Sequence, residues 1–136
     1  MTSDDLNPNE SDEQGRKVGM WTEPDSHGGV MAGEYVDGSR HGVWRHFFAD
    51  GSVRSEGEYE QGIVHGAWTW HRASGGLLQR GGFLAGEKHG QWERWDAEGN
   101  LIDSGIWDRG KKIGEWTYYN PDGSIKRTTK HRPKAP

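Results

Sequence analysis

The stretch GEYEQGIVHGAWTWHRASG, residues 57–75, contains one full copy of a pattern that runs through most of the chain. Its centre, HGAW at 65–68, returns as HGVW at 41–44, as HGQW at 89–92 and, with a different first letter, as IGEW at 113–116. A degenerate first copy begins at Gly19 and Trp21. A fixed period of this length, here 24 residues, is the signature of a repeat architecture, so we expect one structural unit per period.

Glycines and large aromatic residues keep their places from copy to copy. Sixteen of the 22 glycines fall on four columns, and each column aromatic follows a column glycine by two residues. Because side chains alternate along a strand, that glycine lies on the same face as the ring and leaves bare backbone, over which a ring from the adjacent strand can pack. We therefore interpret these positions as packing sites: Gly42, Trp44, Gly57, Tyr59, Gly66, Trp68, Gly81, Phe83, Gly90, Trp92, Gly105, Trp107, Gly114 and Trp116.

The segments between the turns predict strands and no helix. Turn-forming Asp, Asn, Pro and Gly residues recur at 49–52, 96–100 and 120–124, and a second set of turns recurs at 36–38, 60–62 and 108–110. The segments between them are seven to nine residues long and alternate with period two. The fold class expected is all-β: an elongated, twisted antiparallel meander with one hairpin per 24 residues and strands near 42–48, 53–60, 66–71, 77–84, 90–95, 101–108 and 114–119.

Length and charge favour a single repeat domain between two charged tails. Residues 1–15 hold five acids and no base, and residues 126–136 hold five Lys or Arg and no acid, so we expect disordered tails around a repeat domain at 16–125. The net charge is −4, and no apolar stretch approaches the 18 residues of a membrane span. A cytoplasmic protein without an export signal is the expectation, with no nucleic acid partner.

Candidate chemical residues are few. Cysteine is absent, which excludes thiolate metal sites and a cysteine nucleophile. His41, His65 and His89 form a column, but equivalent residues one copy apart are separated by two strands, roughly 9.5 Å, which is too far for sharing one zinc ion. His46 and His71 stand outside that column without a carboxylate at a motif spacing. We predict no metal site, no cofactor and no catalytic residue, and hence no enzyme activity.

The frame G-x-[YFW]-x-x-G-x-x-H-G-x-W-x-x-[aromatic]-x-x-x-G in residues 57–75 resembles the MORN repeat, in the bacterial variant that ends its strand on G-x-W-x-x-Y. The resemblance covers residues 19 to about 125, with His71 at a position where the family prefers an aromatic residue. It implies an elongated antiparallel sheet. Chains built from this variant alone are similar to YwqK-type antitoxins, and that resemblance implies inhibition of a partner toxin by binding.

The sequence is compatible with three functions. The leading hypothesis is a protein-binding scaffold that neutralises a partner toxin by stoichiometric binding. The first alternative is a module for membrane surfaces or phospholipids, which needs a basic face, whereas residues 16–125 are acidic in sum. A weaker alternative is a glycan-binding module, and the oligomeric state is open. The face opposite the packing aromatics interleaves acids with rings, and its candidate contact residues for a basic partner are Arg54, Glu56, Glu58, Trp95 and Tyr119.

Overall fold

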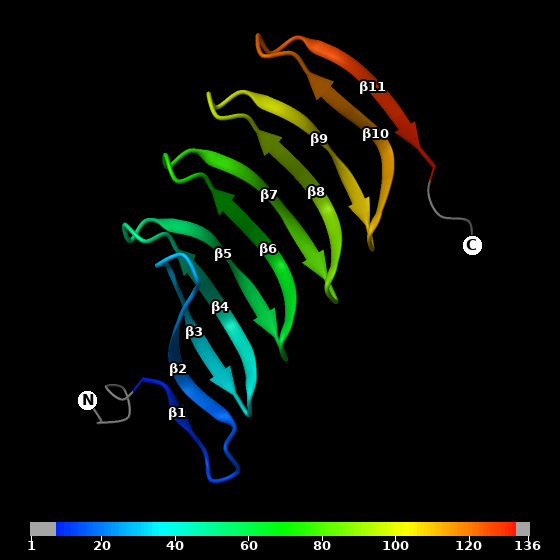
Figure 1. The fold of residues 1–136 in the computed structure, drawn as a ribbon. Helices are drawn as coiled ribbons and strands as arrows, with labels where there is room; N and C mark the ends of the chain where they lie inside the picture. Colours follow the sequence, from blue (N-terminus) through cyan, green and yellow to red (C-terminus); the bar gives the residue numbers. More distant parts are fainter. Residues whose placement is uncertain (1–7, 133–136) are drawn as a thin grey trace.

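The computed structural model describes residues 8–132 and shows one antiparallel sheet of 11 strands in sequential order. The hairpins lie side by side, so the sheet is elongated, and the first and the last strand lie at its opposite ends (Figure 1). Within the described residues there is no helix. The strands are β1 (Glu10–Ser11), β2 (Lys17–Pro24), β3 (Val30–Val36), β4 (Ser39–Phe47), β5 (Val53–Glu60), β6 (Ile63–His71), β7 (Leu77–Leu84), β8 (Glu87–Trp95), β9 (Leu101–Asp108), β10 (Lys111–Tyr119) and β11 (Ile125–His131).

The predicted all-β meander is confirmed, with one systematic difference in strand limits. β5, β7 and β9 have the predicted limits, but β4, β6, β8 and β10 each begin three residues earlier than predicted. The reason is the tight turn that precedes them. In the turn at 61–62, Gln61 and Gly62 have φ of 51° and 82°, and two consecutive positive φ values are the mark of a type I′ hairpin turn, which needs only two residues. The strand therefore resumes at Ile63, and His65 lies within it.

The His-Gly-x-Trp signature forms a bulge in each long strand. Glu56 pairs with Thr69 and Glu58 pairs with His65, so the three residues from Gly66 to Trp68 face Gly57 alone. Gly66 has a φ of 69°, in the region that side chains other than glycine seldom adopt. The bulge turns the Trp68 ring back over the neighbouring strand, where its Nε1–H donates to the Glu58 carbonyl oxygen at 3.2 Å. The same bond recurs from Trp44 to Glu34, from Trp92 to Gly82 and from Trp116 to Ile106.

The ring-over-glycine prediction holds for one glycine column and is wrong for the other. A Cβ added at Gly57 would overlap the Trp68 ring, and Gly33, Gly81 and Gly105 meet Trp44, Trp92 and Trp116 in the same way. A Cβ at Gly66 would meet only a Glu58 carboxylate oxygen at 3.5 Å, and Gly42, Gly90 and Gly114 have no atom within 4 Å. These four have positive φ. Glycine is required there by backbone conformation, so Gly66→Val is expected to strain the bulge and not to displace a ring.

The core is a ladder of rings on one face of the sheet. Trp44, Trp68, Trp92 and Trp116 are buried, each at most 7% exposed. Rings from the two aromatic columns alternate and meet edge to face, with centroids 5.1 Å apart for Tyr35 and Trp44 and 5.4 Å apart for Tyr59 and Trp68. Aromatic pairs favour this geometry, and their large buried surfaces replace the missing aliphatic core.

Both ends of the sheet extend past the expected repeat domain. β1 pairs with β2 through Glu10 and Ser11, and the side chain of Asn9 both donates to the Thr22 carbonyl and accepts from the Thr22 amide. β11 pairs with β10 along its length, so residues 126–131 form part of the sheet and the expected disordered tail does not begin at 126. Residues 1–7 and 133–136, the outer parts of the two predicted tails, lie outside the described residues.

Candidate functional site

The pairing register divides the side chains between two faces of different character. Gly42, Trp44 and His46 lie opposite Tyr59, Gly57 and Ser55, on what we call the aromatic face. The alternate residues form the outer face, where Val43 and Arg45 lie opposite Glu58 and Glu56. Each face is a candidate binding surface, because the meander leaves both uncovered by any other described element.

The outer face combines acids with exposed apolar side chains. Val43, Ile63, Leu84 and Ile106 are 43%, 50%, 40% and 44% exposed. Three of them lie directly across from a glutamate: Val43 opposite Glu58, Ile63 opposite Glu60 and Leu84 opposite Glu87. Exposed apolar groups that are rimmed by polar and charged side chains are typical of surfaces that bind other proteins.

The predicted contact residues fall in two places on the sheet. Glu56 and Glu58 lie on the outer face of β5, where Glu56 forms an ion pair with Arg45. Arg54 is exposed at the bulge where the pairing of β4 and β5 shifts, and its guanidinium lies 5.6 Å from the centre of the Phe48 ring. Trp95 and Tyr119 are half-buried at the ends of β8 and β10, far along the sheet from β5. The structure therefore does not bring the five residues together in one cluster.

The histidine column lies on the outer face, within β4, β6 and β8. His89 Nδ1 accepts a hydrogen bond from the Arg109 amide at 3.3 Å and lies 3.6 Å from Asp108 Oδ1, and His65 Nε2 lies 3.7 Å from Glu60 Oε2. Within residues 8–132, no group of three or more His, Cys, Asp and Glu side chains is arranged to hold a metal ion. That same part of the chain has no helix of the length and apolar character needed to cross a membrane.

His46 does have a carboxylate partner, which the sequence interpretation missed. Its Nε2 lies 2.6 Å from Asp25 Oδ2 across a hairpin. Asp25 also accepts from the amides of His27 and Gly29. The hydrogen bond with His46 is the main cause that lowers the pKa of Asp25 from 3.8 to about 2, with the two amides adding to it. The pair joins the loop at 25–29 to β4.

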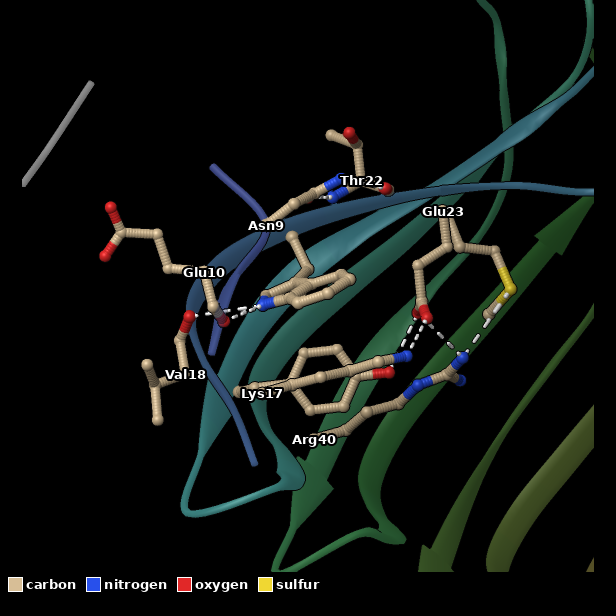
Figure 2. A network of polar contacts seen from close by, with 10 residues as sticks. Asn9, Glu10, Lys17, Val18, Thr22, Glu23 and Arg40 are labelled. Atoms are coloured by element: carbon tan, nitrogen blue, oxygen red, sulfur yellow. Dashed lines mark hydrogen bonds and ion pairs between the residues drawn. The ribbon is translucent and has the colours of Figure 1, made fainter. Parts of the chain in front are cut away.

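On the aromatic face, a network of charged side chains occupies the N-terminal end. The Glu23 carboxylate lies 2.8 Å from Lys17 Nζ, accepts from the Tyr35 hydroxyl at 2.9 Å and lies 3.4 Å from Arg40 Nη2 (Figure 2). Burial acts to raise the pKa of Glu23, but the hydrogen bonds from Lys17 and Tyr35 outweigh it and hold the pKa below its ordinary value. The same hydrogen bond raises the pKa of Lys17. At this end of the face, both cations are paired with a carboxylate of the same chain.

The C-terminal end of the aromatic face contains a cavity of about 330 Å³ with three cations. We call it the lysine pocket; its lining includes Lys88, Arg94, Asp103, Trp107, Lys112 and Trp116. Lys88 Nζ lies 4.8 Å from the ring centres of both Trp92 and Trp107, and Lys112 Nζ lies 4.6 Å from that of Trp116. Asp103, 4% exposed, is held by Arg94 through Nε at 3.1 Å and Nη2 at 2.6 Å, which raises the pKa of Arg94.

These cations were not among the predicted binding residues, although the repeat contains a signal for them. Lys17, Arg40, Lys88 and Lys112 occupy one column, two residues before the glycine of the signature, with Val64 as its only uncharged member. The expectation that no basic face exists came from the summed charge of residues 16–125. That expectation is wrong, because the pairing register places Lys17, Arg40, Lys88 and Lys112 on the aromatic face and most of the acids on the outer face.

Comparison with known proteins supports a repeat protein of the expected kind. A family model described as a MORN repeat variant matches residues 40–61 and 112–131, which span most of β4 with β5 and most of β10 with β11. Among solved structures, a chain in the crystal structure of the GtfA/B complex bound to UDP and GlcNAc is similar, with 13% identity and a TM-score of 0.37. That match covers 68% of this chain and 23% of the other. No curated protein matches.

Proposed function

We propose that this MORN-repeat protein is a non-enzymatic, cytoplasmic binding scaffold that neutralises a partner toxin by one-to-one binding, as an antitoxin-like inhibitor. The binding surface is the outer face, and the partner is a basic protein with apolar contact residues. MORN repeats are in general binding modules for proteins or membranes, and the toxin partner is the specific step of this proposal.

The observation that carries the proposal is the chemistry of the outer face. Val43, Ile63 and Leu84 are exposed, and each is paired across the strands with a glutamate. A partner that covers this surface removes apolar area from water while its cations meet the carboxylates. Long-range attraction by the acids also raises the association rate, which suits an inhibitor that must capture its target quickly.

The test is capture from a lysate of the native host with two baits, the wild-type protein and the variant E56K/E58K. We expect a basic protein that binds the wild type at a one-to-one ratio in sedimentation equilibrium and binds the variant at least tenfold more weakly. Coexpression of the wild type should then relieve growth inhibition by that protein. A captured protein that binds both baits equally would contradict the use of the outer face.

A second function, binding to anionic membrane surfaces, is favoured by a different observation. β11 is exposed over most of its length and carries Lys126, Arg127 and Lys130, and the lysine pocket adds cations to the aromatic face. Clustered cations of this kind are attracted to anionic lipids. If purified protein captures no protein but binds phosphatidylserine vesicles, and replacement of those three basic residues abolishes the binding, the membrane function replaces the antitoxin proposal.

A further inference from the structure

The cation column of the aromatic face is built to surround a carboxylate, as the N-terminal end shows. Lys17 and Arg40 belong to this column, and both contact Glu23, which lies two residues after Trp21 in the first repeat. The cations also lie over rings, with Lys17 Nζ 4.7 Å from the Trp21 ring centre and Arg40 Cζ 4.4 Å from that of Trp44. In the first repeat the protein therefore supplies its own anion.

The corresponding position in the fourth repeat carries the opposite charge. Two residues after Trp92 stands Arg94, where the first repeat has Glu23. Arg94 is engaged by Asp103, the one carboxylate of the lysine pocket. Among the described residues, no carboxylate lies within 4.0 Å of the ammonium groups of Lys88 or Lys112.

The aromatic ladder is interrupted at the same place. In the third repeat the residue two positions after Trp68 is Trp70. The centre of its ring lies 5.8 Å from that of Trp68 and 5.6 Å from that of Trp92. One repeat later Arg94 stands at that position, and Trp92 makes no ring contact with Trp107 within the described chain. The lysine pocket is the resulting space, and its volume of about 330 Å³ exceeds that of a single carboxylate group.

We propose that the lysine pocket binds the carboxylate side chains of an acidic peptide segment of another protein, with Lys88 and Lys112 as the ligand-binding cations. The model for this interaction is the N-terminal network, where the Glu23 carboxylate binds the cations of the same column. A carboxylate that enters between the two lysines relieves the repulsion of two like charges that flank the Trp107 ring, at 4.8 and 5.8 Å from its centre.

An extended peptide fits the spacing of the two lysines. Lys88 lies on β8 and Lys112 on β10, so their strands are about 9.5 Å apart. In an extended polyproline II segment, which has three residues per turn and a rise of about 3.1 Å per residue, residues three apart project to the same side about 9.3 Å from each other. Acidic side chains at that separation reach both ammonium groups at once. The site lies on the aromatic face, opposite the outer face, so it is independent of the antitoxin proposal.

The experiment is isothermal titration of the full-length protein with hexaglutamate at low ionic strength, with hexaglutamine as the uncharged ligand control. We expect hexaglutamate to bind, hexaglutamine not to bind, and K88M/K112M to weaken the affinity for hexaglutamate at least tenfold. The matched control is K111M/K130M, which removes two lysines from the same part of the sheet but from the outer face. It should change the affinity less than twofold.

Three further outcomes are decisive. Binding of hexaglutamate that K111M/K130M weakens as much as K88M/K112M would show a diffuse charge effect and overturn the site. Inorganic phosphate that binds as tightly as hexaglutamate would overturn the peptide assignment in favour of a small anion. Vesicles of phosphatidylserine that bind through Lys88 and Lys112 while hexaglutamate does not would assign the pocket to lipid headgroups. Circular dichroism of each variant confirms that the sheet is intact.

Discussion

The first and fourth repeats share the glycine and tryptophan positions of the repeat pattern, which we call the frame, but they differ in the charged residue that follows the tryptophan. Around Trp21, the two cations of the column, Lys17 and Arg40, both pair with the Glu23 carboxylate of the same chain (Figure 2). Around Trp92, the same column faces Arg94 and leaves a cavity with two lysines. Both copies contain the glycine and the tryptophan of the signature, and they carry opposite charge at the residue two positions after the tryptophan. In this sheet the frame residues fix the positions of the side chains. The residues at the variable positions determine whether the cations pair with a carboxylate of the same chain or line a cavity.

The largest effect on stability is expected from a substitution at a glycine that lies under a tryptophan ring, made once in each half of the sheet. A Cβ at Gly57 or at Gly105 would overlap the tryptophan ring that lies on it, so Gly57→Ala and Gly105→Ala should each lower the free energy of unfolding by about 3 kcal/mol, the upper part of the usual range for overpacking. Urea unfolding measures both. Gly76→Ala is the control, because a Cβ there meets no atom within 4 Å and its cost should be near zero. Unequal losses at Gly57 and Gly105 would show that the two halves do not share one packing frame.

The next largest effect is a difference in stability cost between a substitution in the N-terminal network and one in the lysine pocket. Glu23→Gln should destabilise by about 1 to 2 kcal/mol, because it removes charge-assisted hydrogen bonds to Lys17 and Arg40 in a half-buried setting. Lys112→Met keeps the apolar stem over the ring and should cost at most about 0.5 kcal/mol. The same urea experiment measures the difference. Equal costs would mean that the lysine pocket is as internally satisfied as the N-terminal network.

The sequence predicts the frame well because each frame residue has a local physical reason. Glycine and tryptophan at a 24-residue spacing indicate hairpins and a ring ladder, and both are present. The sequence does not tell Gly66 from Gly57, since both precede an aromatic residue by two positions. Only the bulge separates them, by giving Gly66 a φ of 69° and by placing the Trp68 ring on Gly57.

The candidate sites were harder to predict, because they depend on register. The summed charge of the repeat region conceals the separation of cations and acids onto opposite faces. Asp25 and His46 meet across a hairpin although they are 21 residues apart, which no motif spacing signals. Conversely, Glu56 and Trp95 alternate correctly onto one face, yet three strand spacings, about 14 Å, separate their strands.

The pair formed by Asp25 and His46 predicts that stability depends on pH in the acidic range. The pKa of Asp25 is lowered to about 2, so its contribution to stability is fully present above pH 4 and is lost as the pH falls from 4 towards 2. Asp25→Asn should therefore reduce the loss of stability over that range, measured by urea unfolding at several pH values. The control is Asp50→Asn, in a loop without a histidine partner and with a pKa lowered mainly by Ser52, which should leave the contribution of Asp25 in place. A pH profile of Asp25→Asn that matches the wild type would contradict the assigned role of the pair.

The smallest effect on stability is expected on the outer face, where the largest effect on binding is proposed. Glu56 pairs with Arg45 at the surface and Glu58 is exposed, and exposed ion pairs contribute about 0 to 1 kcal/mol. E56K/E58K should therefore leave the free energy of unfolding within about 1 kcal/mol of the wild type, while it slows association with a basic partner in a salt-dependent way. Stopped-flow association at two ionic strengths measures the second effect, with K88M/K112M as a control that alters only the aromatic face. An association rate that falls with K88M/K112M and not with E56K/E58K would move the protein-binding surface from the outer face to the aromatic face.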